Sequence, residues 1–519
     1  MAKTHARIKG WKWALAITAI LSSIFLYALD ATIVADIQPV IVDEFDALAD
    51  ISWLGVGFLL SATATNMIWG RIYTQFNPKW LYIFNLVLFE AGSALCGGAL
   101  NINAFIVGRI LCGIGGAGLY IGVMTLISIT TTMAERPLYV SSTGITWGLG
   151  IVLGPIIGGS FVGSSVGWRW AFYINLFIGA TAAPAYLFLL PSKDPLPGVP
   201  WKNRLAEMDC IGAVFLIGCL VSLILAINLG GVVYPYNSGQ IIGLFVVFGV
   251  LLLLLTFQQT FTILTTRERR LMPVQFFRSR TMLLLFVVTA ASASAAFTPI
   301  YFVPLFFQFT RNDGALAAGV RLLPLIVVLV VFIFVNGGLI ARLGYYMPWY
   351  TIGGLLALAG GALMYTVNQG TSESRIYGYT VLIGAGVGLW LQASFSVAQA
   401  IVEPKNIPPA ISFLTLSQFL GNTVSLAIAN SNFLNGSQTG LRMLFPSLVV
   451  SEIRQVIQGV SGGFLQSLDP ELRSRALEVI VDNINKTYIL VITSGSLVAL
   501  LSLFMKREKL FLSSGAAAG

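Results

Sequence analysis

The sequence predicts an all-α, polytopic membrane protein, and its composition, its hydropathy and the length of its apolar runs support this fold class. Of its 519 residues, 56% are hydrophobic and only 10% are charged, whereas soluble domains carry roughly 25% charged residues. The mean hydropathy is +0.84. The apolar runs each approach the roughly 20 residues that a helix needs to cross a bilayer, and we count fourteen of them. The expected spans are 13–34, 51–69, 81–100, 105–125, 141–162, 170–190, 210–229, 241–264, 282–307, 319–340, 349–367, 376–400, 411–433 and 488–504.

The first span and the loop charges set the expected orientation. A secretory signal peptide is shorter and ends in a small-residue cleavage site, whereas the first span carries Asp30 and lacks such a site. Lys and Arg concentrate in alternate loops, above all in the arginine cluster of residues 267–280, so the positive-inside rule places both termini in the cytosol. Contact with anionic lipid heads explains this cluster better than nucleic-acid binding does. We expect the plasma membrane, with a vacuolar or vesicle membrane as the alternative.

Several classes of function are excluded by the residues that the chain lacks. The only histidine, His5, lies in the N-terminal tail, which argues against haem ligation and histidine-dependent hydrolysis. No GxxxxGK[ST] sequence is present, so we expect no nucleotide hydrolysis. Cys96, Cys112, Cys210 and Cys219 lie in or at the start of apolar runs without metal-ligand spacing, which is typical of small core residues. We therefore expect no enzyme activity, no metal and no cofactor, but a monomeric secondary transporter, a channel or a scaffold.

The chain also contains an internal repeat. The turn after the second span has the sequence GRIYTQFNPK, and the turn after the tenth has GGLIARLGYYMP. Matching turns indicate two six-helix bundles with an inserted helix pair, and parallel repeats of this kind place a substrate path at their interface. The expected parts are a cytosolic N-terminal tail (1–12), the N-terminal bundle (13–191), a cytosolic linker (192–208), the inserted pair (209–265), a basic cytosolic linker (266–281), the C-terminal bundle (282–504) with an external loop (434–487), and a cytosolic C-terminal tail (505–519).

The external loop carries a helix signal of its own. Asp469 is placed as an N-cap, and Pro470 as the first helical residue. We expect this amphipathic helix to lie on the outer surface of the membrane. Asn435 and Asn485 begin Asn-X-Ser/Thr sequences, so we expect glycosylation there. The apolar face of the helix consists of Leu472, Ala476, Val479, Ile480 and Ile484.

The stretch GITWGLGIVLGPIIGG, residues 144–159, has glycines at three- to four-residue spacing. This spacing removes the side chains from one helix face and lets a neighbouring helix approach closely. Pro155 removes a backbone donor and bends the helix. A groove that seals one bundle against the other and a plain packing face remain alternatives. The expected groove consists of Gly144, Gly148, Gly150, Gly154, Pro155, Gly158 and Gly159.

Charged residues within the spans are the strongest functional candidates, because each costs about 2.5–3.5 kcal/mol at a helix centre on insertion scales. The rise per residue places Asp30 and Arg109 at similar depths in the outer part of the membrane, so we expect them to pair. Asp36 is expected at the outer interface. Glu90 is expected near the midplane, where burial favours the protonated form and a role as proton carrier. The alternatives are that Asp30 caps a helix or snorkels at the interface, and that Glu90 is a neutral hydrogen-bonding group between helices.

Four motifs together resemble one known family. They are LDATIVADIQPVI in the first span, VGRILCGIGGAG in the fourth, the glycine-proline stretch of the fifth and WRWAFYINL before the sixth. The chain resembles the major facilitator superfamily along nearly its whole length, and specifically the fourteen-helix drug:proton antiporters of fungi that export toxins and other secondary metabolites. The resemblance implies the major facilitator fold, a proton gradient as energy source, and proton coupling through Asp30 and Arg109. It also implies that the glycines and proline at 154–159 form the antiporter signature.

The turn after the second span departs from the family pattern. In the family, this turn usually reads like GKLSDIFGRK and helps to lock the cytosolic gate through its charges. Gly70, Arg71 and Lys79 match that pattern, but Thr74 stands in place of the acid and Pro78 in place of a base. We expect Gly70, Arg71 and Lys79 to form the gating loop, with an altered charge relay.

Three functions remain open, of which export is expected. A proton-driven exporter of amphipathic organic compounds needs buried carboxylates and polar residues that face a central cavity. A proton symporter for uptake, such as of an iron chelate, gives no reason for the glycine-proline groove, and a non-transporting sensor or scaffold would carry a large soluble domain. The expected partners are an amphipathic small molecule, protons and the bilayer. The expected cavity residues, whose alternative role is hydrogen bonding between helices, are Trp147, Trp390, Gln392, Gln399, Gln418 and Asn422.

Overall fold

The computed structural model describes residues 10–46, 51–231, 234–446, 448–457, 465 and 467–510. Within these residues the regular structure is helical, apart from one isolated bridge between Gly230 and Tyr234. The expected all-α class is therefore confirmed for the described part of the chain.

Six long helices form the N-terminal half, and two of them begin at asparagine caps. The side chain of Asn77 accepts a hydrogen bond from the backbone of Lys79, and that of Asn101 accepts one from the backbone of Ala104. Such caps satisfy backbone donors that have no partner within the helix. The helices are α1 (Trp11–Phe45), α2 (Ile51–Gln75), α3 (Pro78–Gly97), α4 (Ile102–Thr130), α5 (Arg136–Val162) and α6 (Trp170–Phe188).

The inserted pair is joined by one buried carboxylate. Asp209 caps α8 by accepting from the backbone of Gly212 at 2.9 Å. It also accepts from the side-chain amides of Gln258 at 3.0 Å and Gln259 at 2.6 Å, both on α9. The elements of this region are α7 (Trp201–Ala206), α8 (Cys210–Leu229), α9 (Gly239–Phe261) and α10 (Val274–Arg278).

The C-terminal half has more interrupted helices than the N-terminal half. Gly344 ends α13 with a φ of 77°, a left-handed conformation that glycine adopts without a steric penalty. The elements are α11 (Arg280–Arg311), α12 (Ala315–Val320), α13 (Leu323–Leu343), α14 (Met347–Tyr365), α15 (Glu373–Gly388), α16 (Ala393–Ile401), a 3-10 turn (Pro404–Asn406), α17 (Ile407–Leu444), α18 (Val450–Ile457), α20 (Pro470–Thr487) and α21 (Ile489–Ser502).

Each expected span overlaps helical residues, although not all spans qualify equally as membrane crossings. Thirteen helices of the described residues are long and apolar enough to cross a membrane. The helix α2 covers the expected second span with 25 residues but lies outside that set. The expected tenth span is divided between α12 and α13, and the twelfth between α15 and α16. The chain is thus a multi-pass membrane protein.

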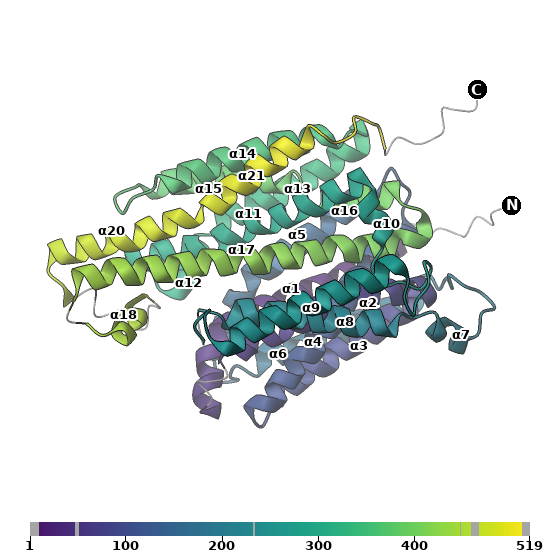
Figure 1. The fold of residues 1–519 in the computed structure, drawn as a ribbon, viewed down its shortest axis with the longest axis horizontal. Coiled ribbons are helices and arrows are strands. Elements are labelled where there is room, and N and C mark those ends of the chain that lie inside the picture. Colours follow the sequence, from purple (N-terminus) through teal and green to yellow (C-terminus); the bar gives the residue numbers. More distant parts are fainter. Residues whose placement is uncertain are drawn as a thin grey trace.

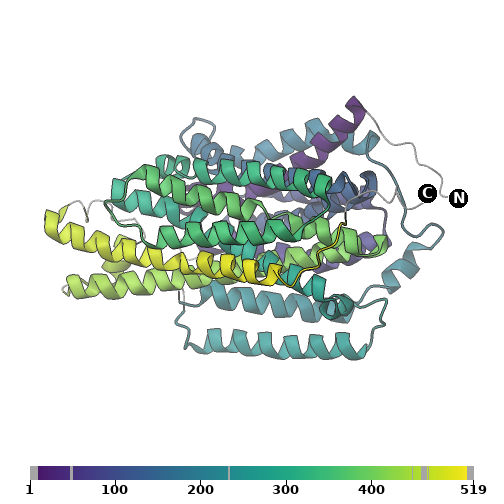
Figure 2. The ribbon, with the colours of Figure 1, turned by 90° about the horizontal axis from the view of Figure 1, so that it is seen from above.

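The long helices lie side by side along one direction (Figures 1 and 2). The start of α1 and the end of α21 lie at the same end of the bundle, which we call the terminal end, and we call the opposite end the distal end (Figure 1). The helices α8 and α9 pack mainly on each other and touch the rest through α2 and α17. Most of α9 is exposed, as expected for a helix at the periphery that faces lipid.

The two halves meet closely at the terminal end. The side-chain amide of Asn66 on α2 donates to the backbone carbonyl of Ser412 on α17 at 2.7 Å, and a β-carbon at Gly70 would overlap the Ser412 hydroxyl. On the other side of the interface, a β-carbon at Gly337 of α13 would overlap the hydroxyl of Ser141 on α5. The terminal end is therefore closed by contacts between the halves on both sides of their interface.

The external helix expected on the membrane surface is instead half of a protruding hairpin. The helix α17 continues beyond the expected end at 433 as far as Leu444, and α20 lies alongside this extension (Figures 1 and 2). Ala476, Ile480 and Ile484 of α20 are buried, and Val479 contacts Gly440 of α17. The expected apolar face is confirmed for Ala476, Val479, Ile480 and Ile484, whereas Leu472 is exposed. The helix packs mainly on α17, so its apolar side faces the protein rather than a lipid surface.

Candidate functional site

A buried ion pair between α1 and α4 is the first part of the site. Arg109 Nη1 lies 2.5 Å from Asp30 Oδ2, and the two side chains are 1% and 0% exposed. Arg109 also donates through Nη2 to the Asp30 backbone carbonyl at 3.2 Å and through Nε to the backbone carbonyl of Leu54 at 3.1 Å. The pairing expected from helix depth is present. Because the Asp30 side chain is fully buried, it does not snorkel to the interface.

Asn175 of α6 links this ion pair to α3. Its side-chain nitrogen donates to the Ser93 hydroxyl at 3.0 Å and lies 3.5 Å from Asp30 Oδ1. The sequence reasoning missed Asn175. The signal was available, because a lone amide in an apolar helix needs a hydrogen-bond partner.

Glu90 lies on α3 where that helix faces α6. A β-carbon at Gly179 of α6 would overlap Glu90 Oε1. Both carboxyl oxygens of Glu90 are buried and have no hydrogen-bond partner among the described residues, and Glu90 does not line the cavity described below. It precedes Ser93 by three residues, so the two lie on the same face of α3. The side chain of Asp36 lies outside the described residues.

The distal glycines of α5 pack against α1, which belongs to the same half. A β-carbon at Gly150 would lie 2.5 Å from the β-carbon of Ala28, and one at Gly154 would overlap the hydroxyl of Thr32. Gly158 also approaches the backbone of α1. In this structure, in which the terminal end is closed, this part of α5 therefore faces its own half. The groove was expected to face the other bundle when the cytosolic side is open, and the spacing of glycines does not specify which neighbour uses each face.

The glycines nearer the terminal end do face the other half. A β-carbon at Gly144 would lie 2.8 Å from Gln392 Cγ, and one at Gly148 would lie 2.6 Å from a methyl carbon of Val330 on α13. Gly159 meets open space. The expected sealing contact between the bundles is thus limited to Gly144 and Gly148.

A cavity of about 660 Å³ lies between the two halves, within the size range of small-molecule sites. It extends from the buried Gln392 to residues near the distal ends of their helices, such as Gln38, Gln308 and Asn435. Pro155, which interrupts the backbone bonding of α5, also lines it. Because the terminal end is closed, the cavity faces the distal end.

Most of the expected cavity residues line this space, and two do not. Trp390 is 0% exposed, and its ring lies against Gly353 of α14. Gln399 is 1% exposed, and its backbone carbonyl accepts from Arg136 at 3.4 Å within the terminal-end contact. Both expectations need correction, because an apolar helix that is buried all round gives no sequence signal for its cavity side. The expected residues that line the cavity are Trp147, Gln392, Gln418 and Asn422.

The sequence reasoning missed much of the lining. Tyr27, Tyr120 and Tyr301 face the cavity from the other helices, and Asn430 continues the lining along α17. Asn430 lies eight residues after Asn422, which places both on one helix face. A count of polar residues at this spacing would have found Asn430.

The turn after α2 is tied to the loop that precedes α8. Arg71 donates to the backbone carbonyl of Glu207 at 3.3 Å, and Lys79 donates to a backbone carbonyl near the end of α6 at 2.6 Å. The carboxylate of Glu207 accepts from Arg269 at 2.8 Å, and this bond holds the pKa of Glu207 below its usual range. Thr74 stands where the family usually has an acidic residue. Arg71 instead bonds to the backbone carbonyl of Glu207, which lies in another loop.

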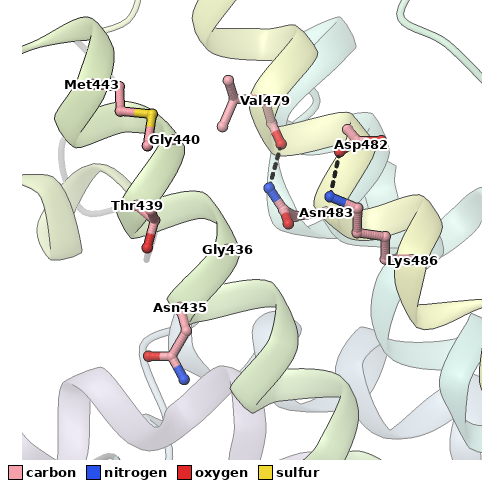
Figure 3. A pocket seen from close by; sticks show the side chains of 9 residues that line it. All are labelled: Asn435, Gly436, Thr439, Gly440, Met443, Val479, Asp482, Asn483 and Lys486. Atoms are coloured by element: carbon pink, nitrogen blue, oxygen red, sulfur yellow. Dashed lines mark hydrogen bonds and ion pairs between the residues drawn. The ribbon is translucent and has the colours of Figure 1, made fainter.

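The hairpin holds a second, shallow pocket of about 500 Å³ between α17 and α20 (Figure 3). Asn435 is exposed at its edge and stays a predicted glycosylation site. Asn485 is 7% exposed, and its side-chain amide donates to the backbone carbonyl of Val367. A glycan needs a solvent-facing amide, so the structure contradicts glycosylation of Asn485.

Two helical halves around a polar cavity, with a charge pair buried in one half, define a secondary transporter. The model of the Major Facilitator Superfamily matches residues 19–426, and the chain belongs to this family. Solved structures agree in fold. The proton:xylose symporter XylE bound to 6-bromo-6-deoxy-D-glucose gives a TM-score of 0.59 at 14% identity, over 96% of this chain and 98% of that one. The human organic anion transporter MFSD10 gives 0.58 at 13% identity, over 94% and 100%.

Closer relatives come from fungi. The MFS-type transporter pgmG of Aspergillus terreus is 53% identical over 98% of this chain and 90% of its own length. The efflux pump alnA of Emericella nidulans is 45% identical over 98% and 93%, and the efflux pump patC of Aspergillus clavatus is 42% identical over 96% and 91%. The resemblance seen in the motifs is confirmed, and the chain is a transporter rather than an enzyme.

Proposed function

We propose that this transporter is a proton-coupled antiporter that exports an amphipathic organic compound by alternating access. The observation that carries the proposal is the Asp30–Arg109 pair, which is sealed inside the N-terminal half. It involves α1, the helix that lines the cavity through Tyr27 and Ala31. One helix therefore bears both a proton-binding group and a wall of the substrate site. The names of the efflux-pump relatives support export rather than uptake.

The pair offers a physical route from proton binding to the gate. A proton on the Asp30 carboxylate removes its negative charge and weakens its attraction to Arg109. A shift of α1 reaches α5, because the two helices approach backbone to backbone at Gly150. The helix α5 in turn contacts α13 of the other half at Gly148. Proton binding at Asp30 thereby biases the contacts between the halves that close the terminal end.

Glu90 is proposed as a second proton site. Its carboxyl is buried without a partner among the described residues, so it exchanges a proton without first breaking an ion pair. It lies outside the cavity, on the α3 face that also carries Ser93, which is bonded to Asn175 beside Asp30. Protons and substrate would then use different parts of the N-terminal half.

The orientation and location are part of the same proposal. The positive-inside rule places both chain ends in the cytosol, so the terminal end is cytosolic and the cavity is open to the outside. The transporter works as a monomer in the plasma membrane, or in a vacuolar or vesicle membrane. Its energy source is the proton gradient, with no other cofactor.

Transport in vesicles tests the proposal. Wild-type protein should accumulate a fluorescent amphipathic compound in inside-out vesicles that are acidified inside. Asp30→Asn should lose this accumulation at an equal protein level, and Arg109→Ala should fail similarly because it leaves a buried charge unpaired. Accumulation only in right-side-out vesicles that are acidified outside would reverse the assigned direction. Full activity of Asp30→Asn would remove Asp30 from the mechanism.

A further inference from the structure

Among the described residues, the lining of the cavity contains many polar atoms but no formal charge. No Asp, Glu, Lys, Arg or His side chain is among the described residues that line it. Its polar groups are the carboxamides, hydroxyls and phenols of Asn, Gln, Thr, Ser and Tyr, which are neutral near pH 7. In the part of the lining that the structure describes, a ligand therefore meets hydrogen-bonding partners without meeting a counter-ion.

The charges buried in the same half do not supply that counter-ion. Asp30 and Arg109 are 0% and 1% exposed and lie 2.5 Å from each other, and neither lines the cavity. Their charges compensate each other, so the pair presents a short dipole to its surroundings and no net charge. Glu90 also lies outside the lining.

Unpaired carboxamide oxygens point to the hydrogen bonds that a ligand would make. Gln392 Oε1 and Asn422 Oδ1 are buried and have no hydrogen-bond partner among the described residues. Gln418 and Asn430 lie four residues before and eight residues after Asn422, on the same cavity face of α17. A carboxamide accepts through its oxygen and donates through its nitrogen. Hydroxyl and carbonyl groups on a ligand would satisfy this row of amides.

Aromatic rings from other helices also line the cavity. The rings of Tyr27 and Trp147 lie 5.2 Å apart at 68°, and those of Trp147 and Tyr120 lie 6.2 Å apart at 77°. All three residues line the cavity, as does Phe297 on α11. Rings prefer offset-stacked or edge-on contacts with other rings, so these side chains favour a ligand that has its own ring system.

We propose that the cavity binds neutral organic molecules that combine a ring system with several hydroxyl or carbonyl groups, and that it rejects permanent cations and anions. The inference rests on the proposed function only for the conclusion that such molecules are exported. The physical reason for rejection is that a buried charge without a counter-ion loses its hydration, and a cation–π contact with the rings only partly offsets that loss.

Equilibrium binding to the purified, full-length protein tests the proposal. The probes are a dimethoxyanthraquinone, which is neutral, and two derivatives of it that carry a trimethylammonium or a sulfonate group. We expect both charged derivatives to bind at least about tenfold more weakly than the neutral probe. Gln418→Glu should raise the affinity for the trimethylammonium derivative, because it places a carboxylate in the cavity. Ser164→Glu adds the same charge at an exposed position outside the cavity and should leave the ranking unchanged.

The outcomes separate this inference from the proposed function. Equal or tighter binding of either charged derivative by the wild-type protein would overturn the inference, as would a Gln418→Glu protein that binds the cation no better. Proton-driven export of cations would support the antiporter function and contradict only the proposal that the site binds neutral molecules. Selective binding of the neutral probe without proton-driven transport would support the neutral site and contradict the antiporter function.

Discussion

At the residue scale, Arg109 shows why a buried charge here needs its full set of partners. Its guanidinium reaches the Asp30 carboxylate, the Asp30 backbone carbonyl and the Leu54 backbone carbonyl, and its charge lies 4.4 Å from the centre of the Phe58 ring. The guanidinium is planar, so its N–H groups make these contacts in fixed directions. Losing any one of them leaves a buried carbonyl or charge without compensation.

Arg109→Lys should therefore impair proton-driven transport although the charge is kept. A lysine ammonium cannot span the two helices that the guanidinium joins, and the loss of a hydrogen bond to a charged group costs about 1.5–3 kcal/mol. We expect transport in vesicles to fall by about tenfold or more at equal protein level. Arg475→Lys, in an exposed pair on the hairpin, is the matched control and should transport normally. A fully active Arg109→Lys protein would show that charge alone suffices.

The glycines of α5 give a second prediction at this scale. Gly144→Ala places a methyl group 2.8 Å from Gln392 Cγ and 3.1 Å from Ile333, and overpacking of this kind typically costs about 1–3 kcal/mol. The expected result is slowed transport with normal membrane insertion, because the contact joins the two halves. Gly159→Ala meets open space and should behave as wild type in the same vesicle assay. Equal rates for the two variants would argue against a role of this contact in the transport cycle.

At the scale of elements, the protruding hairpin and the inserted pair are held by different means. The hairpin buries Ala476, Ile480 and Ile484 of α20, a helix that packs mainly on α17. Such packing is stabilising because it removes apolar surface from water. The inserted pair, by contrast, depends on the polar cluster of Asp209 with Gln258 and Gln259. Polar contacts of this kind hold helices together in lipid, where apolar surfaces gain little by packing.

Asp209→Ala should accordingly destabilise the inserted pair. It leaves the buried amide of Gln258 and one helix cap without an acceptor, whereas the Gln259 amide keeps its bond to Gln258. Each unsatisfied group costs about 1–3 kcal/mol. The expected result is a lower melting temperature of the purified protein. Asp482→Ala on the exposed face of the hairpin removes only an i,i+4 pair with Lys486, which is worth about 0–1 kcal/mol. Equal melting temperatures for the two variants would mean that the cluster does not hold the pair.

At the scale of the whole molecule, the fold and the Asp30–Arg109 ion pair could be predicted from the sequence. Which residues pack against each helix face could not. Hydropathy predicts where the chain crosses the membrane, and the rise per residue predicts the depth of each residue. Similar depth was therefore enough to predict that Asp30 and Arg109 pair. Neither quantity fixes the rotation of a helix about its axis. For that reason Trp390 was expected in the cavity but is buried behind it, and Asn175 was missed although it touches Asp30.

The longest-range features were also the least predictable. The departure from the family pattern at Thr74 was visible in the sequence, but the tie from Arg71 to Glu207 crosses 136 positions of the chain. Likewise, glycine spacing marked α5 as a close-packing helix without showing that Gly150 faces α1 and Gly148 faces α13. Such contacts depend on how whole helices are arranged, and no local pattern records that arrangement.

The closed terminal end leads to a prediction about the whole cycle. An alternating-access transporter has to make and break the contacts between its halves, and in this structure those contacts rest on glycines at Gly70 and Gly337. Leucine at Gly337 would collide with Ser141 of the opposite half, whereas the neighbouring Gly338 meets nothing within 4 Å. Gly337→Leu should therefore hold the terminal end open and abolish transport, and Gly338→Leu should do neither.

The measurement is alkylation of a cysteine placed at the buried contact. Gln399→Cys, in a background in which the exposed Cys210 is replaced by serine, should react slowly with a membrane-impermeant maleimide added to inside-out vesicles. Adding Gly337→Leu should raise its reaction rate by about tenfold or more, because a bias of about 1.4 kcal/mol changes a two-state population by that factor. Slow alkylation in the Gly337→Leu protein would mean that the halves still close, and the glycine contacts would then not control the gate.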